Sequence, residues 1–114
     1  MEKTIEIDGK KIKLKSTGAT ALRYKAQFQQ DFFNDLFKLV KGGKIEKDGT
    51  IDPSTIESMD FEFFYNYTWV LAKQADKEIP DPIEWLDGFD VFPIIDIIPE
   101  IQDLLYKTIQ SKKK

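Results

Sequence analysis

Acidic residues are the side chains that cluster most closely in this sequence, and clustered carboxylates can bind a metal ion or catalyse a reaction. Nine of them lie between residues 76 and 103, where Lys77 is the sole basic residue: Asp76, Glu78, Asp81, Glu84, Asp87, Asp90, Asp96, Glu100 and Asp103. A calcium loop needs oxygen ligands at alternate positions with a central glycine and a closing glutamate, and a catalytic carboxylate pair needs a pocket that shifts one pKa. The sequence has neither pattern, so it favours a solvated acidic surface over a metal site or a carboxylate enzyme.

Other catalytic chemistry is excluded by composition. The chain contains no Cys and no His, which removes disulfides, Cys and His zinc sites, and nucleophiles that depend on an imidazole base. Gly42, Gly43 and Gly49 lack the preceding strand and the spacing of a phosphate-binding loop. We therefore expect no catalytic residue, no metal and no cofactor, and we predict that the protein is not an enzyme.

Four basic residues near the N-terminus are candidates for a nucleic-acid site. They are Lys10, Lys11, Lys13 and Lys15. Proteins that bind single strands place stacking aromatic residues among their lysines, and none lies between these four. With a pI near 5.0, nucleic acid is not an expected partner, and the lysines are typical of a protected strand edge.

Charge is distributed unevenly along the chain. Residues 1–50 contain 11 basic and 7 acidic residues, whereas residues 51–114 contain 6 basic and 13 acidic residues. Oppositely charged halves can attract each other between molecules, so a homo-oligomer is a possible assembly. Such attraction would be weak and sensitive to salt.

Aromatic residues are the stronger indication of function. The chain has nine Phe, four Tyr and two Trp, more than one inward-facing stripe of each predicted helix can hold. The candidates for contact with a partner are Phe28, Phe32, Phe37, Phe63, Tyr65, Trp69 and Trp85. The alternative is that helices covered on two sides bury these rings, since aromatic residues are enriched in cores and in interfaces alike.

A β-hairpin is predicted over residues 3–15. Apolar and polar residues alternate twice, with Ile5 and Ile7 in the first run and Ile12 and Leu14 in the second. Asp8-Gly9 between the runs is typical of a tight hairpin turn. We expect the apolar face of the hairpin to pack on the helix that follows.

Helical periodicity predicts the remaining elements. The expected helices span residues 19–40, 54–76, 82–87, 91–97 and 99–110, with Pro93 and Pro99 in the first turns of the last two. Residues 41–53 read as a flexible loop and residues 111–114 as a frayed tail. The sequence therefore predicts one domain, residues 1–114, of the α+β class, in which a hairpin packs on a mainly helical body.

Four segments resemble, in this order, the tail assembly chaperones of long-tailed phages and prophages of Gram-positive bacteria. They are the hairpin with RYKAQFQQDFFNDLFKL (residues 23–39), WVLAKQAD (69–76), IEWLDGFD (83–90) and IPEIQDLL (98–105). The resemblance spans roughly residues 4–109, and residues 41–53 lie outside its pattern. Each segment alone is an amphipathic pattern with a few marked residues, and the ordered set carries the likeness.

The resemblance implies a small, mostly helical protein that is not an enzyme and is absent from the finished virion. Its partner would be the tape-measure protein, a long helical chain that the chaperone keeps soluble during tail morphogenesis. In this family a longer form, made by translational frameshift, is thought to recruit the major tail (tube) protein. The run Lys112 to Lys114 is compatible with an adenine-rich slippery site, and equally with a solubilising basic tail.

A second reading of the same features is a small cytoplasmic adaptor or antitoxin-like interaction module of unrelated lineage. Both readings place the chain in the cytoplasm of a bacterium. No apolar run approaches the roughly 20 residues of a membrane span, and the N-terminal residues lack the apolar core of a secretory signal.

Overall fold

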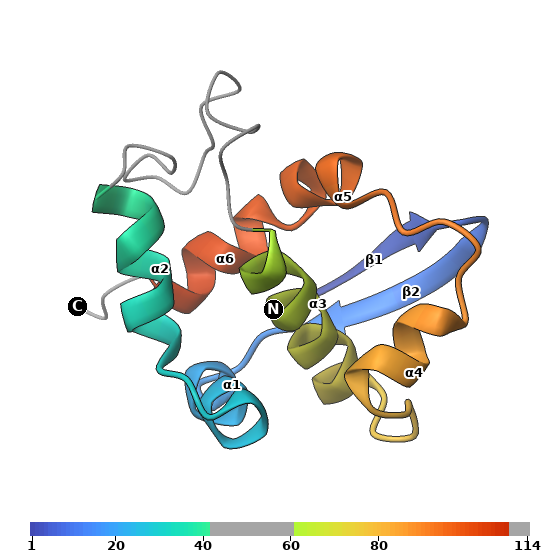
Figure 1. Cartoon of the computed structure of the whole chain (residues 1–114). Helices are drawn as coiled ribbons and strands as arrows, with labels where there is room; N and C mark the ends of the chain where they lie inside the picture. The colour runs from blue at the N-terminus through green and yellow to red at the C-terminus, as the bar shows by residue number, and fades with distance from the viewer. Residues whose placement is uncertain (42–60, 110–114) are drawn as a thin grey trace.

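The computed structural model describes residues 1–41 and 61–109, and the side chains of residues 37–41 and 109 are outside this description. The elements are β1 (Glu2–Ile7), β2 (Lys10–Lys15), α1 (Thr20–Phe28), α2 (Phe32–Lys41), α3 (Glu62–Ala75), α4 (Pro82–Asp87), α5 (Ile94–Glu100) and α6 (Gln102–Ile109), as labelled in Figure 1. The α+β class with mainly helical content is thus confirmed. Residues 42–53 of the predicted loop, residues 54–60 of the predicted second helix and the tail 111–114 lie outside the described residues.

The hairpin forms as the sequence predicts. β1 and β2 are antiparallel, with Ile5 opposite Ile12, and the turn residues Asp8 and Gly9 have φ angles of 55° and 77°. Positive φ at both central positions is the type I′ geometry whose twist matches that of the strands. On one face Ile5, Ile7 and Leu14 are buried, and on the opposite face the register places Glu2 opposite Lys15 and Glu6 opposite Lys11.

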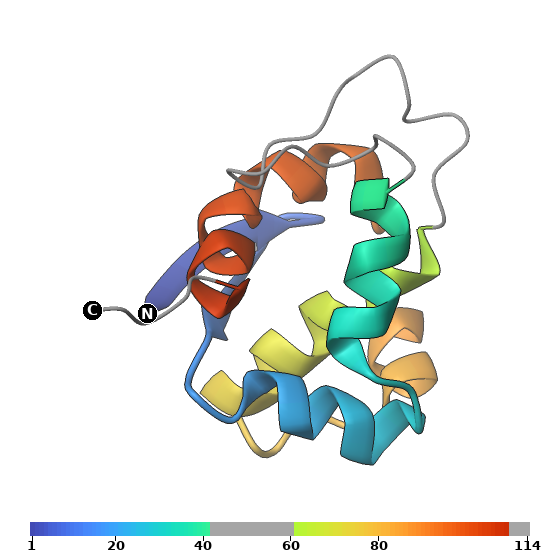
Figure 2. The ribbon, with the colours of Figure 1, turned by 90° about the vertical axis from the view of Figure 1, so that its left-hand side faces the viewer.

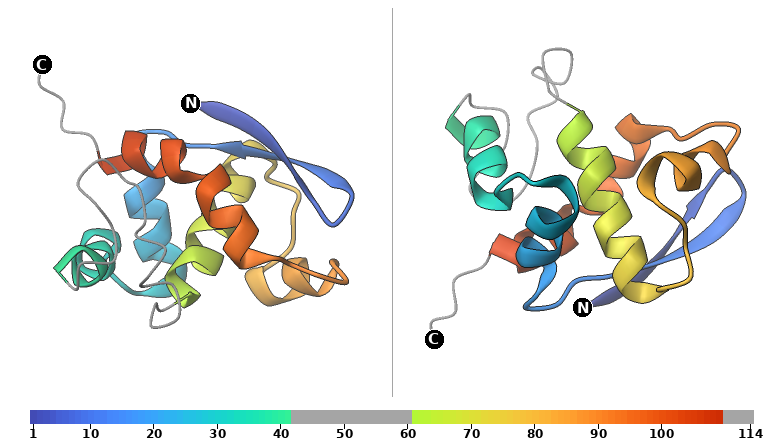
Figure 3. Two further views of the ribbon diagram at one scale, coloured as in Figure 1. Left: turned by 90° about the horizontal axis from the view of Figure 1, so that it is seen from above. Right: turned by 60° about the horizontal axis from the view of Figure 1, so that its bottom comes forward.

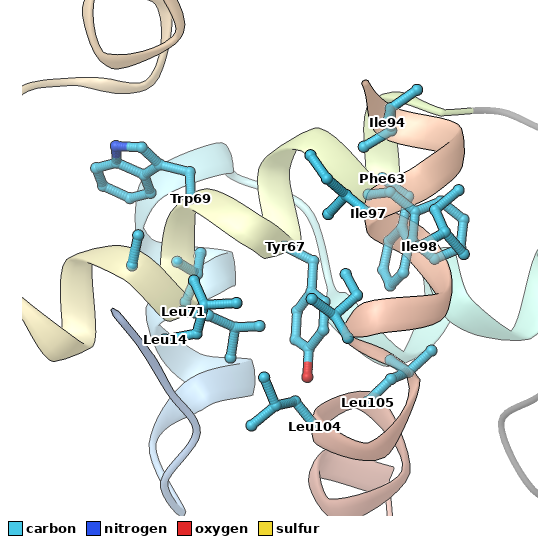
Figure 4. Close-up of a cluster of buried hydrophobic side chains, with 14 of the residues drawn as sticks. Leu14, Phe63, Tyr67, Trp69, Leu71, Ile94, Ile97, Ile98, Leu104 and Leu105 are labelled. Atoms are coloured by element: carbon cyan, nitrogen blue, oxygen red, sulfur yellow. The ribbon is translucent and has the colours of Figure 1, made fainter. Parts of the chain in front are cut away.

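The centre of the fold is α3. Figure 1 shows this helix between the hairpin, the α1–α2 pair and the C-terminal helices. Phe64, Tyr67 and Leu71 of α3 have no exposed surface, and Figure 4 shows Tyr67 and Leu71 among Leu14 of the hairpin and the leucines of α6. β2 packs chiefly on α3, rather than on the first helix as the sequence predicted. Leu14 of β2 and Leu71 of α3 are fully buried and lie beside each other in Figure 4, so burial of apolar surface favours this arrangement.

The C-terminal helices close the core from the other side. Ile94, Ile97, Ile98 and Ile101 are buried with Leu104 and Leu105. The predicted helices 91–97 and 99–110 begin later, at Ile94 and Gln102, and Pro99 lies inside α5 rather than in the first turn of the last helix. Pro93 takes the N-cap position of α5. Pro99 has no N–H to donate to the carbonyl oxygen of Ile95, so it removes one i→i−4 hydrogen bond near the end of this short helix.

The predicted helix 19–40 is wrong, because it is two helices that meet at a corner. Gln29 adopts the left-handed conformation (φ 61°) and its N–H donates to the carbonyl oxygen of Lys25 at 2.8 Å, which ends α1. Asp31 then accepts the N–H of Asn34 at 2.9 Å and so caps the start of α2. Figure 2 shows α2 turning sharply away from α1 at this point. Among the described residues, no helix is long and apolar enough to cross a membrane.

Candidate partner-binding surface

Of the seven aromatic residues predicted to bind a partner, the six whose side chains are described lie in the core or pack against it. Four are buried, with 0% (Phe32), 4% (Phe63), 5% (Trp69) and 8% (Trp85) of their surface exposed. Phe28 and Tyr65 are half-buried and pack against the core, and the side chain of Phe37 is outside the described residues. In the folded chain the four buried rings stabilise the core, and a contact between them and a partner stays a prediction.

Most of these rings form one cluster where α1, α2 and α3 meet. The centroid of Phe32 lies 5.5 Å from the centroids of Tyr24, Phe63 and Tyr67. Phe28 adds an edge-to-face contact with Trp69 at 5.9 Å. The corner at Gln29 is what brings Phe32 onto α3, so this cluster depends on the break between the two helices.

The hydroxyl groups of the two buried tyrosines are both paired. Tyr24 donates to Oδ2 of Asp35 at 2.9 Å, and the hydroxyl of Tyr67 lies 2.7 Å from Oγ1 of Thr108. Burial raises the pKa of both phenols above the usual value, and the neighbouring carboxylate of Asp35 raises the pKa of Tyr24 further. Both groups are therefore neutral hydrogen-bonding elements of the core at physiological pH.

A second aromatic cluster lies at α4 and the connection to α5. The Trp85 centroid is 5.2 Å from that of Phe89 and 5.8 Å from that of Phe92, and Phe92 is 5.5 Å from Tyr65 of α3. Trp85 is buried, whereas Phe89 and Phe92 are half-buried. Phe89 and Phe92 were not among the predicted site residues. Their signal in the sequence was the presence of two aromatic residues within the short Gly88 to Pro93 segment.

Apolar side chains around this second cluster are exposed. The exposed fractions are 73% for Ile83, 59% for Val91 and 49% for Ile95. We define the α4–α5 surface as Ile83, Phe89, Val91, Phe92 and Ile95. Elsewhere in the described residues, Met1, Leu22, Phe33 and Tyr106 are the large apolar side chains that are exposed. Adjacent apolar positions on one short segment are more typical of a binding surface than single scattered ones.

The charge around the α4–α5 surface is negative. Glu84, Asp87, Asp90 and Asp96 are all exposed, and no basic residue occurs in the sequence between Lys77 and Lys107. Carboxylates of one sign create a potential that attracts cationic partners and repels anionic ones. The surface therefore fits a partner segment that combines apolar and basic residues.

The turn of the hairpin holds this surface in place. Lys10 donates from Nζ to the carbonyl oxygen of Gly88 at 2.6 Å and lies 5.1 Å from the centroid of the Phe89 ring. Asp8 accepts the N–H of Asp90 at 2.9 Å. Figure 3 shows the turn beside the connection between α4 and α5. The hairpin thus positions Phe89 as well as covering the core.

Comparisons with models of known protein families, with curated proteins and with solved structures find no match. The resemblance to tail assembly chaperones stays a prediction from the sequence segments. In the described part of the chain, no group of three or more acidic side chains is arranged to hold a metal ion. The α4–α5 surface is therefore the candidate binding surface among the described residues.

Proposed function

We propose that this protein is a tail assembly chaperone of a long-tailed phage or prophage. It binds the tape-measure protein and keeps it soluble during tail morphogenesis, and it is not retained in the virion. A longer frameshifted form recruiting the major tail protein belongs to the same proposal. The observation that supports the binding role is the α4–α5 surface, where exposed apolar side chains lie in a segment with four exposed carboxylates. Lys10 of the hairpin turn is the basic side chain that contacts Phe89 of this surface.

The composition of this surface suits a chaperone for an aggregation-prone chain. Val91 and Ile95 offer apolar contacts to the apolar stripe of a client helix, and removing that stripe from water suppresses association of clients with one another. The carboxylates of Asp90 and Asp96 stay hydrated and keep the complex negatively charged, which favours solubility. A small set of exposed side chains supports reversible binding, as release of the client during tail assembly requires.

Co-expression with the tape-measure protein encoded beside this gene tests the proposal. We expect the tape-measure protein to become soluble and to co-purify with this chain. The double variant Val91→Ser with Ile95→Ser should reduce the soluble, co-purified fraction, because both changes remove exposed apolar surface without disturbing the core.

Leu22→Ser is the control. Leu22 is 72% exposed on α1, so this change removes the exposed apolar surface of one side chain at a position outside the α4–α5 surface. The control variant should solubilise the client as well as the unaltered chain does. A client that stays insoluble with the unaltered, folded chain in excess, and also with the longer frameshifted form, would contradict the proposal and favour the adaptor or antitoxin-like reading.

A further inference from the structure

One edge of β2 carries backbone groups that point away from β1. The amino group of Met1 donates to the carbonyl oxygen of Ser16 at 2.9 Å, and the N–H of Ser16 donates to the carbonyl oxygen of Met1 at the same distance. In an antiparallel pair such hydrogen-bonded positions alternate with positions whose N–H and C=O point the other way. From the register, Lys11 and Lys13 occupy the alternate positions. Their N–H and C=O groups therefore face away from β1.

These groups have no hydrogen-bond partner in the described part of the chain. Figure 1 shows β2 on the side of the hairpin that faces α3 and α4. A strand edge of this kind is a template for a further strand. Lysines along the edge protect it against strands of like charge, but they do not repel a strand that carries acidic residues. Here α3 packs beside β2 but leaves space next to Lys11 and Lys13.

That space is a pocket of about 320 Å³ at the middle of β2. Its lining combines the strand with the end of α3 and with α4: Lys11, Ile12, Lys13, Ala72, Ala75, Asp76, Ile79 and Trp85. Ala72 and Ala75 are small, so the pocket has room beside the strand, and Ile12, Ile79 and Trp85 give it apolar walls. The indole N–H of Trp69 donates to the carbonyl oxygen of Pro80 at 2.9 Å, which ties the segment before α4 to α3.

We propose that the free edge of β2 binds an extended segment of a partner protein as a third strand. The N–H and C=O groups of Lys11 and Lys13 would pair with its backbone, and apolar side chains on one face of the segment would enter the pocket. Residues opposite one another in a sheet share a face. The other face of the segment would therefore lie beside the exposed ammonium groups of Lys11 and Lys13.

Charge determines which segment fits. On its paired edge, β2 already has acidic neighbours on this outer face, since Glu6 is opposite Lys11 and Glu2 is opposite Lys15. A third strand with acidic residues at its outward positions would extend the same alternation of charge. The occupant is thus a segment in which apolar and acidic residues alternate, a pattern different from the basic, helical segment that suits the α4–α5 surface.

A second copy of β2 is a poor occupant. Pairing two β2 edges would set the lysines of one strand beside those of the other, and like charges across strands destabilise a sheet. The site uses the hairpin edge rather than the exposed residues of the α4–α5 surface. The proposal therefore goes beyond the chaperone function and does not depend on it.

Titration of the full chain with designed peptides tests the site. The probe is a capped eight-residue peptide of alternating Val and Glu, and its controls are a peptide of the same composition in scrambled order and one of alternating Val and Lys. We expect the Val and Glu peptide to bind more tightly than either control, by calorimetry. Binding should also slow hydrogen exchange of the Lys11 and Lys13 amides, with a smaller effect at Ile12, whose amide already faces β1.

Two changes separate strand addition from simple attraction. N-methylation of the peptide amides that face β2 should weaken binding about tenfold, because two backbone hydrogen bonds are lost. The variant K11Q with K13Q should weaken the Val and Glu peptide about fivefold, whereas the matched change K25Q on the exposed surface of α1 should not.

Three results would overturn the proposal. One is that the alternating peptide binds no better than the scrambled peptide. Another is that N-methylation has no effect, which would mean that side chains alone are recognised. The third is that the Lys11 and Lys13 amides become protected without peptide as protein concentration rises, which would identify a second copy as the occupant.

Discussion

The ammonium nitrogen of Lys10 lies 2.6 Å from the carbonyl oxygen of Gly88, so the turn of the hairpin is fixed to the end of α4. The bond between the N–H of Asp90 and Asp8 joins residues 82 positions apart in the sequence. Both contacts bracket Phe89, whose ring also lies under the Lys10 nitrogen. The N-terminal hairpin therefore controls the geometry of the acidic segment that carries the exposed apolar residues.

Removing the charge of Lys10 should show how much its contacts with Gly88 and Phe89 stabilise the fold. Lys10→Met keeps the aliphatic stem but removes the hydrogen bond to Gly88 and the contact with the Phe89 ring. We expect the free energy of unfolding to fall by about 1 kcal/mol, as for one charged hydrogen bond at an exposed site. Urea denaturation measures the change. Lys11→Met on the outer face of the same strand is the control, and an equal fall for both variants would contradict the role given to Lys10.

The two buried tyrosines predict a loss of stability at alkaline pH. Burial raises the pKa of Tyr24 and Tyr67 in the folded chain, whereas the unfolded chain has tyrosines with the ordinary pKa of about 10. Above that pH the unfolded state binds fewer protons than the folded state, so the free energy of unfolding decreases as pH rises. Below it the contribution of these groups is fully present.

Urea denaturation between pH 8 and pH 11 tests this sign. Each tyrosine contributes a slope of up to about 1.4 kcal/mol per pH unit above pH 10. The double variant Tyr24→Phe with Tyr67→Phe should be less stable at pH 8, because hydrogen bonds to Asp35 and Thr108 are lost. It should also have a shallower decline above pH 10. Parallel declines for both chains would show that the two tyrosines do not cause the loss of stability.

The elements that depend on local chemistry were predictable from the sequence. Alternation around Asp8-Gly9 predicted the hairpin, and the predicted helix 82–87 is present as α4, with Asp81 at its N-cap, Pro82 in its first turn and Gly88 at its C-cap. The corner at Gln29 was not predictable, because helical periodicity continues across it and glutamine is not a typical left-handed residue. Asp31, a good N-cap residue, was the signal that was missed.

The sequence predicted that aromatic residues form the candidate site, but it did not predict which of their side chains are exposed. Phe32 and Phe63 are buried because the corner turns α2 onto α3, and a sequence pattern does not contain that rotation. Conversely, Val91 and Ile95 are exposed although their types favour burial. The hydrogen bonds that link the hairpin turn to Gly88 and Asp90, just before these residues, join distant parts of the sequence.

Gln29 should tolerate glycine and reject a branched residue. Its φ of 61° is unfavourable for side chains with a Cβ and is neutral for glycine. Gln29→Gly should therefore raise the free energy of unfolding by up to about 1 kcal/mol, and Gln29→Val should lower it by about the same amount. Thermal unfolding followed by circular dichroism measures both. Gln30→Gly, next to the corner, is the control, and a gain there equal to that at Gln29 would contradict the assigned strain.

Burial of Phe32 gives a prediction that separates stability from binding. The side chain has no exposed surface and contacts Tyr24, Phe63 and Tyr67, so Phe32→Ala should cost about 3–5 kcal/mol. That is a large part of the total stability of about 5–15 kcal/mol that small domains have. Circular dichroism during urea denaturation should show the loss, together with reduced recovery of soluble protein.

Ile95→Ser is the matched change at an exposed apolar position. It should alter the free energy of unfolding by less than about 0.5 kcal/mol while reducing capture of the tape-measure protein in the co-expression experiment. Phe32→Leu, which retains most of the buried volume, should restore both folding and capture relative to Phe32→Ala. If Phe32→Ala keeps the stability of the unaltered chain and yet loses the client, Phe32 contacts the partner directly, and the core position assigned to it is wrong.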